Sequence, residues 1–159
     1  MAYIDSNLEF SDAQAITATA LSEDVYDTQS VAAGGGSIGI TGGATSYDLG
    51  QAGKGMFLIV HALTAGGGTG TIIITLESDS TANLATAPTV HFTAATVTAS
   101  AITAGQRIAA VGLPLGLYKR YLGLRFTCSG TPSGVTFDAY LSLEPSGIYR
   151  SYPGNFVVL

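Results

Sequence analysis

The sequence predicts an all-β fold: an antiparallel β-sandwich or jelly roll with extended N- and C-terminal arms. Apolar and polar residues alternate with a period of two in several segments, as they do where successive side chains leave opposite faces of a sheet. Turns that contain glycine or proline separate these segments, and helical periodicity is nearly absent. About seven or eight antiparallel strands with one polar face each form a sandwich or jelly roll.

The expected strands, in chain order, are residues 15–20, 24–28, 56–63, 70–77, 89–93, 107–112, 121–128 and 135–144. The alternation is clearest in the last segment, which points one set of apolar residues inward: Val135, Phe137, Ala139, Leu141 and Leu143. Two other segments each show one apolar face, formed by Ile72, Ile74 and Leu76 and by Leu122, Leu124, Phe126 and Cys128.

Four connecting segments have recognisable turn chemistry. Gly66–Gly68 lies between two apolar strands and predicts a hairpin loop that needs positive φ. Pro132–Gly134 predicts a turn, and Ser11–Gln14 has the spacing of a capping box, which indicates one helical turn. Residues 34–55 are rich in glycine, so we expect a long surface loop there.

The chain is expected to form one domain over residues 1–159, with an N-terminal arm at 1–14 and a C-terminal tail at 145–159. The tail is apolar and aromatic, so it must be buried, either on its own sandwich or on a neighbouring molecule. The residues predicted to contact another subunit come from both ends: Tyr3, Ile4, Leu8, Phe10, Tyr149, Tyr152 and Phe156.

The composition suits a protein that packs against other proteins, and it is also found in ordinary secreted β domains. Hydrophobic residues make up 47% of the chain and charged residues only 11%, against about 25% in an average soluble protein. The net charge is −5, and six basic residues in an acidic chain do not make a nucleic-acid interface.

Charge is unevenly distributed along the chain. The first 53 residues hold seven acids and no Lys or Arg, whereas residues 107–125 hold four bases and no acid. These segments could steer self-association or docking on a partner, or they could be two solvated faces that never meet.

The sequence gives no sign of a membrane protein or a secreted one. No apolar run approaches the ~18 residues of a membrane span, and the first residues lack the pattern of a signal peptide. Cys128 is the only cysteine, so no internal disulfide can form, which suits assembly in a reducing cytoplasm. Its phase with Leu124 and Phe126 indicates a core position rather than a nucleophile.

Each candidate motif for catalysis or ligand binding lacks residues or a structural context that the motif needs. We therefore expect no catalytic, cofactor-binding or metal-binding residues and no enzyme activity. Gly34–Gly39 matches G-x-G-x-x-G literally, but the residues after it cannot open a helix. Gly53–Gly55 lacks the other residues of a phosphate-binding loop, and no G-x-S-x-G elbow is present. The spacing of His61 and His91 does not favour a metal site.

Two stretches resemble a known family. Residues 3–17, which begin Tyr3-Ile4-Asp5 and continue Leu8-Glu9-Phe10-Ser11, are similar to the N-terminus of the capsid cement (decoration) proteins of Bordetella-type tailed bacteriophages. Arg120–Phe126, preceded by Leu113–Gly116 and followed by the closing strand through Leu143, resembles a strand pair of the same family. The glycine-rich segment at 34–55 and the tail beyond Glu144 depart from the family pattern.

The resemblance implies a jelly-roll domain that forms a homodimer, binds the phage major capsid protein on the outside of an icosahedral head, and cements neighbouring capsid subunits. It implies no catalytic residue and no cofactor. The protein would be made in the host bacterial cytoplasm and reside on the outer capsid surface, without nucleic-acid or membrane partners. The alternative is a carbohydrate-binding jelly-roll domain of a phage receptor-binding protein, which the absence of Trp disfavours and the eight Tyr residues keep open.

Overall fold

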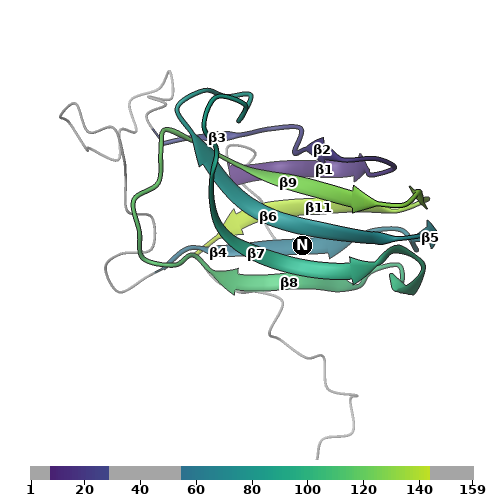
Figure 1. The fold of residues 1–159 in the computed structure, drawn as a ribbon. Helices are drawn as coiled ribbons and strands as arrows, with labels where there is room; N and C mark the ends of the chain where they lie inside the picture. The colour runs from purple at the N-terminus through teal and green to yellow at the C-terminus, as the bar shows by residue number, and fades with distance from the viewer. Residues whose placement is uncertain (1–7, 29–54, 144–159) are drawn as a thin grey trace, which may run out of the picture.

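Two antiparallel β-sheets pack face to face in the computed structural model, which describes residues 8–28 and 55–143 (Figure 1). Sheet 1 contains four strands in the order β1-β11-β4-β8. Their bounds are Glu9–Ala15 for β1, Thr136–Ser142 for β11, Phe57–Ala62 for β4 and Arg107–Gly112 for β8. The glycine-rich segment at 34–54, the tail at 145–159 and residues 1–7 of the arm lie outside the described residues.

Sheet 2 has the order β2-β9-β6-β7, and the short β3 also pairs with β9. The bounds are Ala20–Leu21 for β2, Tyr26–Asp27 for β3, Tyr121–Ser129 for β9, Thr71–Asp79 for β6 and Thr89–Thr98 for β7. Because β2 and β3 pair with opposite ends of β9, together they occupy one edge position of the sheet.

The connections give this sandwich the jelly-roll topology. Leaving aside the short β5 and β10, successive strands cross from one sheet to the other except at β2–β3, which share one edge, and at the hairpin β6–β7. The first and last strands therefore pair at β1-β11, and β9 lies beside β6. A small third sheet, β5 (Gly67–Gly68) with β10 (Pro132–Ser133), lies beside the short 3-10 helix η2 (Ala99–Ala101). The predicted all-β antiparallel sandwich is confirmed.

The core lies between the inner faces of the two sheets. Alternate residues of β6, β9 and β11 are fully or almost fully buried, and among them Phe126 and Phe137 stack across the sheets with ring centroids 5.5 Å apart. Burying each such side chain contributes about 1.5–3 kcal/mol relative to leaving it in water. The predicted inward residues of 70–77 and 121–128 belong to this core, with Cys128 partly buried at its border.

Several expected strands agree with the structure, and the differences have local causes. The segments 56–63, 70–77, 107–112 and 121–128 correspond closely to β4, β6, β8 and β9. The segment 89–93 continues to Thr98, because β7 follows β6 along its whole length through two register shifts. Leu143 is 60% exposed rather than inward, since β11 ends at Ser142.

The N-terminal region differs most from expectation. The helical turn predicted at Ser11–Gln14 is wrong, because these residues lie in β1, which pairs with β11 through two register shifts. The Ser11 hydroxyl does donate to the Gln14 side-chain oxygen at 2.6 Å, but inside an irregular strand in which Ala13 has a φ of 51°. The expected strand at 15–20 is reduced to Ala15 and Ala20, the end of β1 and the start of β2.

The glycine turns are partly confirmed. Gly68 has a φ of 75° and Gly134 a φ of 70°, a conformation that favours glycine. Gly67 and Gly68 nevertheless form β5, which pairs with Ser133 and Pro132 of β10, so the expected loop and turn join in one small sheet.

The loop at 80–88 folds back over the outer face of sheet 2. The fully buried Asp79 carboxylate accepts hydrogen bonds from three backbone N–H groups, those of Ser80 (2.6 Å), Thr86 (2.8 Å) and Ala87 (3.0 Å). Burial alone raises the pKa of Asp79, but these bonds outweigh it and hold the pKa below its ordinary value. The clamped loop places the side chain of Leu84, itself fully buried, against Gly123.

No helix among residues 8–28 and 55–143 is long and apolar enough to cross a membrane.

The variant Gly123→Ala should destabilise the sandwich. A Cβ at this position would lie 2.8 Å from Leu84 Cδ1 and 3.0 Å from Val25 Cγ1, so the loop must shift to admit it. We expect the free energy of unfolding to fall by about 1–3 kcal/mol in urea denaturation. Gly116→Ala is the matched control, since a Cβ there meets no atom within 4 Å. Equal stability of the two variants would contradict this packing.

The variant Asp79→Asn should loosen the 80–88 loop. An amide keeps the shape of the carboxylate but replaces one acceptor oxygen with a donor, which leaves a buried N–H group without its partner. We expect a loss of about 1–3 kcal/mol in unfolding free energy. Asp79 Oδ2 accepts hydrogen bonds from the backbone N–H groups of Thr86 and Ala87. Hydrogen-exchange measurements should show that these two amides exchange faster in the variant. Unchanged protection of these amides would show that the carboxylate does not hold the loop.

Candidate interaction surface

One end of the sandwich gathers most of the features that can contact a partner. In sheet 1, the last residue of β11 pairs with Phe57 at the start of β4, and Phe57 pairs with Gly112 at the end of β8. In sheet 2, Tyr121 at the start of β9 pairs with both Asp27 of β3 and Asp79 of β6. We call this end, with its loops 80–88 and 113–120, the loop-rich end; it lies at the left in Figure 1.

The residues that border the undescribed stretches also lie at the loop-rich end. Glu9 pairs with Tyr140, so β1 begins there, and β3 ends and β4 begins there as well. The described stretches of the chain therefore begin and end, at Leu8, Thr28, Gly55 and Leu143, at the same end of the sandwich.

The structure tests only part of the predicted interface. Tyr3, Ile4, Tyr149, Tyr152 and Phe156 lie outside the described residues.

The remaining two predicted contact residues flank the start of β1. Phe10 is fully buried in the core, so its assignment to a contact between subunits is wrong: β1 is a strand of sheet 1, and the Phe10 side chain faces sheet 2. Leu8 is partly buried against the same core. The expected arm 1–14 is thus shortened, because residues 9–14 belong to β1.

The 113–120 loop presents two exposed leucines between two buried residues. Leu115 and Leu117 are 72% and 73% exposed, more than the other large hydrophobic residues that the structure describes. Leu113 and Tyr118 on either side are 6% and 0% exposed. Leu113 and Tyr118 therefore attach the loop to the body of the protein, and the part between them projects into solvent.

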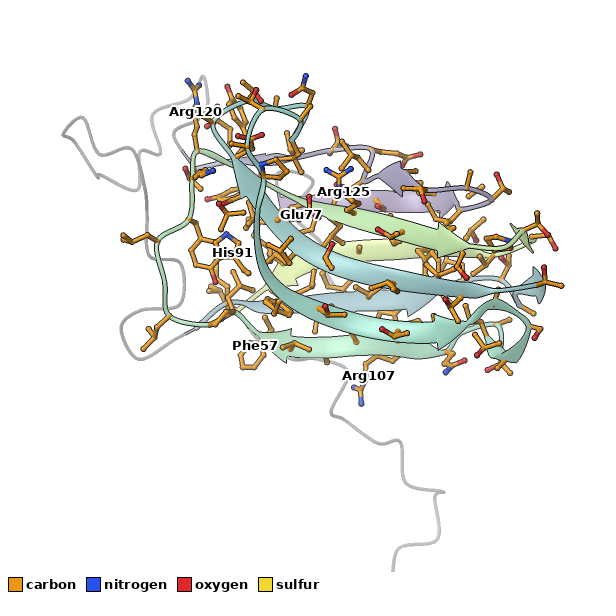
Figure 2. The ribbon with its side chains drawn as sticks, in the orientation of Figure 1. Phe57, Glu77, His91, Arg107, Arg120 and Arg125 are labelled. Atoms are coloured by element: carbon orange, nitrogen blue, oxygen red, sulfur yellow. The ribbon has the colours of Figure 1, made fainter. Side chains whose placement is uncertain are left out.

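The ends of this loop are held by a connected set of contacts. The Tyr118 hydroxyl donates to the Pro114 carbonyl at 2.6 Å, and its ring packs on His91 with centroids 4.2 Å apart. His91 Nε2 lies 2.7 Å from the Ser78 hydroxyl oxygen, which accepts a hydrogen bond from the Lys119 backbone N–H at 3.0 Å. Figure 2 shows His91 at this end of the sandwich.

The ionisation of His91 suits this structural role. Burial lowers its pKa below the ordinary value, and the positive charge of Lys119 lowers it further. The imidazole is therefore neutral near pH 7, and its Nε2 can accept a hydrogen bond from the Ser78 hydroxyl.

Two basic residues of the segment 107–125 form ion pairs with acidic residues of other segments. Arg120 binds both oxygens of Asp27 with two hydrogen bonds, of 3.0 Å from Nε and 2.9 Å from a terminal nitrogen, and its guanidinium lies 4.8 Å from the centroid of the Tyr121 ring. Arg125 binds Glu77 at 2.9 Å on the outer face of sheet 2 (Figure 2). Two of the four bases in 107–125 are thus paired inside the chain. The Arg120–Asp27 pair joins the two charged segments, so they are not simply separate solvated faces.

Acidic groups cluster beside the start of β1. The pKa of Glu9 is raised by burial and then by the nearby carboxylates of Asp12, Asp138 and Asp24. Within the described parts of the chain, no group of three or more His, Cys, Asp or Glu side chains is arranged to hold a metal ion.

The two histidines lie in different sheets. His61, in β4, packs beside Tyr140, with ring centroids 6.3 Å apart, whereas His91 belongs to β7 and contacts Tyr118. The fold does not bring them together. Cys128 lies half-buried at the core border, and burial raises the pKa of its thiol, which makes it a weaker nucleophile.

Sequence reasoning missed the exposed leucines. The stretch Leu113–Tyr118 contains four large apolar side chains, and nothing in their spacing shows which of them are buried. The contact between Tyr118 and His91 determines which of these side chains are buried. This contact joins the 113–120 loop to β7, two segments that are separate in the sequence.

Comparison with curated proteins finds no match. The model of the Bbp16 family matches residues 10–141, from the second residue of β1 to the penultimate residue of β11. The match spans the entire described sandwich, including the 113–120 loop. The chain therefore belongs to the Bbp16 family, whose name indicates a Bordetella phage protein.

Proposed function

We propose that this chain is a structural protein of a phage virion that binds the outside of the icosahedral capsid and cements neighbouring major capsid subunits. The observation that carries the proposal is the Bbp16 match across the whole sandwich, which connects the jelly roll to phage proteins. The loop-rich end adds support, since it presents the exposed leucines Leu115 and Leu117.

A cement protein must resist the pressure that acts on a capsid, and a jelly roll with a continuous core suits that task. The core of this chain joins both sheets, and the 80–88 and 113–120 loops are fixed to it by Asp79 and by Tyr118. Many copies arrayed on one shell act together, so each interface can be modest. Extended terminal segments could add strands to the edges of neighbouring subunits.

The proposal treats the protein as a binding protein rather than an enzyme. Three of the described groups with shifted pKa values or buried charge serve the fold: Asp79 holds a loop, His91 supports Tyr118, and Glu77 pairs with Arg125. We further propose that the protein forms a homodimer, is made in the host cytoplasm and resides on the outer capsid surface.

The proposed function is tested with phage capsids that lack this protein. Purified protein should co-sediment with them saturably, appear on their outer surface in electron micrographs, and raise the temperature at which they break open. Capsids already decorated with the protein serve as the control and should bind no more. Failure to bind the bare capsids would overturn the proposal, and binding to a glycan array would favour the carbohydrate-binding alternative.

Deletion of residues 148–159 tests the proposed contribution of the C-terminal tail. The last described strand ends at Ser142, so the truncated chain keeps every strand of the sandwich and should unfold at a similar temperature. We expect it no longer to decorate capsids, because it lacks the apolar anchors Tyr149, Tyr152 and Phe156. Undiminished co-sedimentation of the truncated protein would remove the tail from the interface.

A further inference from the structure

The exposed leucines of the 113–120 loop are placed as anchors for a partner. Single exposed apolar residues are ordinary on protein surfaces, but Leu115 and Leu117 are two residues apart, each more than 70% exposed, on one projecting loop. Leu63, the other exposed leucine that lies in a loop between strands, is only 41% exposed. Because both side chains lie in solvent, they do not contribute to the hydrophobic core of the molecule.

The loop is already ordered before any partner binds. Tyr118 is fully buried and bonded to the Pro114 carbonyl, the Leu113 N–H donates to the Met56 carbonyl at 2.8 Å, and Lys119 is fixed through its backbone to Ser78. The Lys119 ammonium also donates to the carbonyl of Ala87 in the neighbouring loop. Binding therefore costs little additional ordering of the backbone that carries the leucines, and this favours affinity.

We propose that Leu115 and Leu117 insert into an apolar cavity of a capsid-shell subunit and anchor this protein on the capsid. The inference rests on the proposed function and names the surface that performs it. The cavity should have an acidic rim, because the positively charged Lys119 adjoins the leucines in the same loop.

The charges disfavour a second copy of this chain as the occupant. A two-fold contact between two such loops would place the Lys119 residues of both copies close together, and like charges at an interface repel.

The double variant Leu115→Ser/Leu117→Ser tests the anchor, with Leu63→Ser as the matched control. Leu63 follows β4 and lies at the end of the sandwich opposite the loop-rich end, so it receives the same substitution far from the proposed contact. All three leucines are exposed, so both variants should unfold at the temperature of the unaltered protein. We expect the double variant to bind bare capsids roughly 10- to 100-fold more weakly, and the control to bind normally.

A third variant, Tyr118→Phe, tests whether the loop is pre-ordered. It keeps the ring on His91 but removes the hydroxyl that donates to the Pro114 carbonyl. We expect its capsid affinity to fall less than that of the double variant, while both leucines remain present. The position of Tyr118 makes it a positioning residue, which acts through the leucines.

The outcomes separate the anchor from the proposed function. Normal capsid binding by the double variant, with normal binding by the unaltered protein, would overturn the leucine anchor and leave the cement role in place. Loss of self-association in light scattering without loss of capsid affinity would assign the leucines to a contact between copies and would also overturn it. Failure of the unaltered protein to bind would overturn the cement role itself.

Discussion

The contact between the inner faces of the two sheets is the interaction on which the rest of the structure depends. It is centred where Phe126 of β9 stacks on Phe137 of β11, two residues brought together by strands of opposite sheets. Because side chains alternate along a strand, fixing these two also fixes which residues face outward. Gly123, Arg125 and Glu77 are on the outer face of sheet 2 for this reason, and they receive the 80–88 loop.

The strand content could be predicted because period-two alternation is a local property of the backbone. On this basis the sequence predicts segments 107–112 and 121–128 to within a residue, and the buried face that it predicts for 121–128 is correct. The same rule fails at β1, where the pairing partner is distant along the chain: the Ala13 N–H bonds to Asp138, 125 residues away. There the spacing of Ser11 and Gln14 indicated a helical turn, but pairing with β11 determines the conformation.

The candidate surface was less accessible to sequence reasoning than the fold. Phe10 has the character of an interface anchor, yet its position in β1 places it in the core. Leu115 and Leu117 have the character of core residues, yet Tyr118 and Leu113 take the interior positions of their loop. The hydrophobicity of a side chain indicates that its burial is favourable. The topology determines whether the side chain is buried inside its own molecule or against another one.

The first and last described residues, Leu8 and Leu143, both lie at the loop-rich end, and this has a consequence for engineering. A peptide inserted next to either residue would begin beside the surface proposed to meet the capsid. Cargo meant to face outward is better inserted between strands at the opposite end, where η2 leads into β8. Gly105 lies in that connection, and the space where a side chain would project is open. An insertion there would display a foreign epitope without passing through the docking surface.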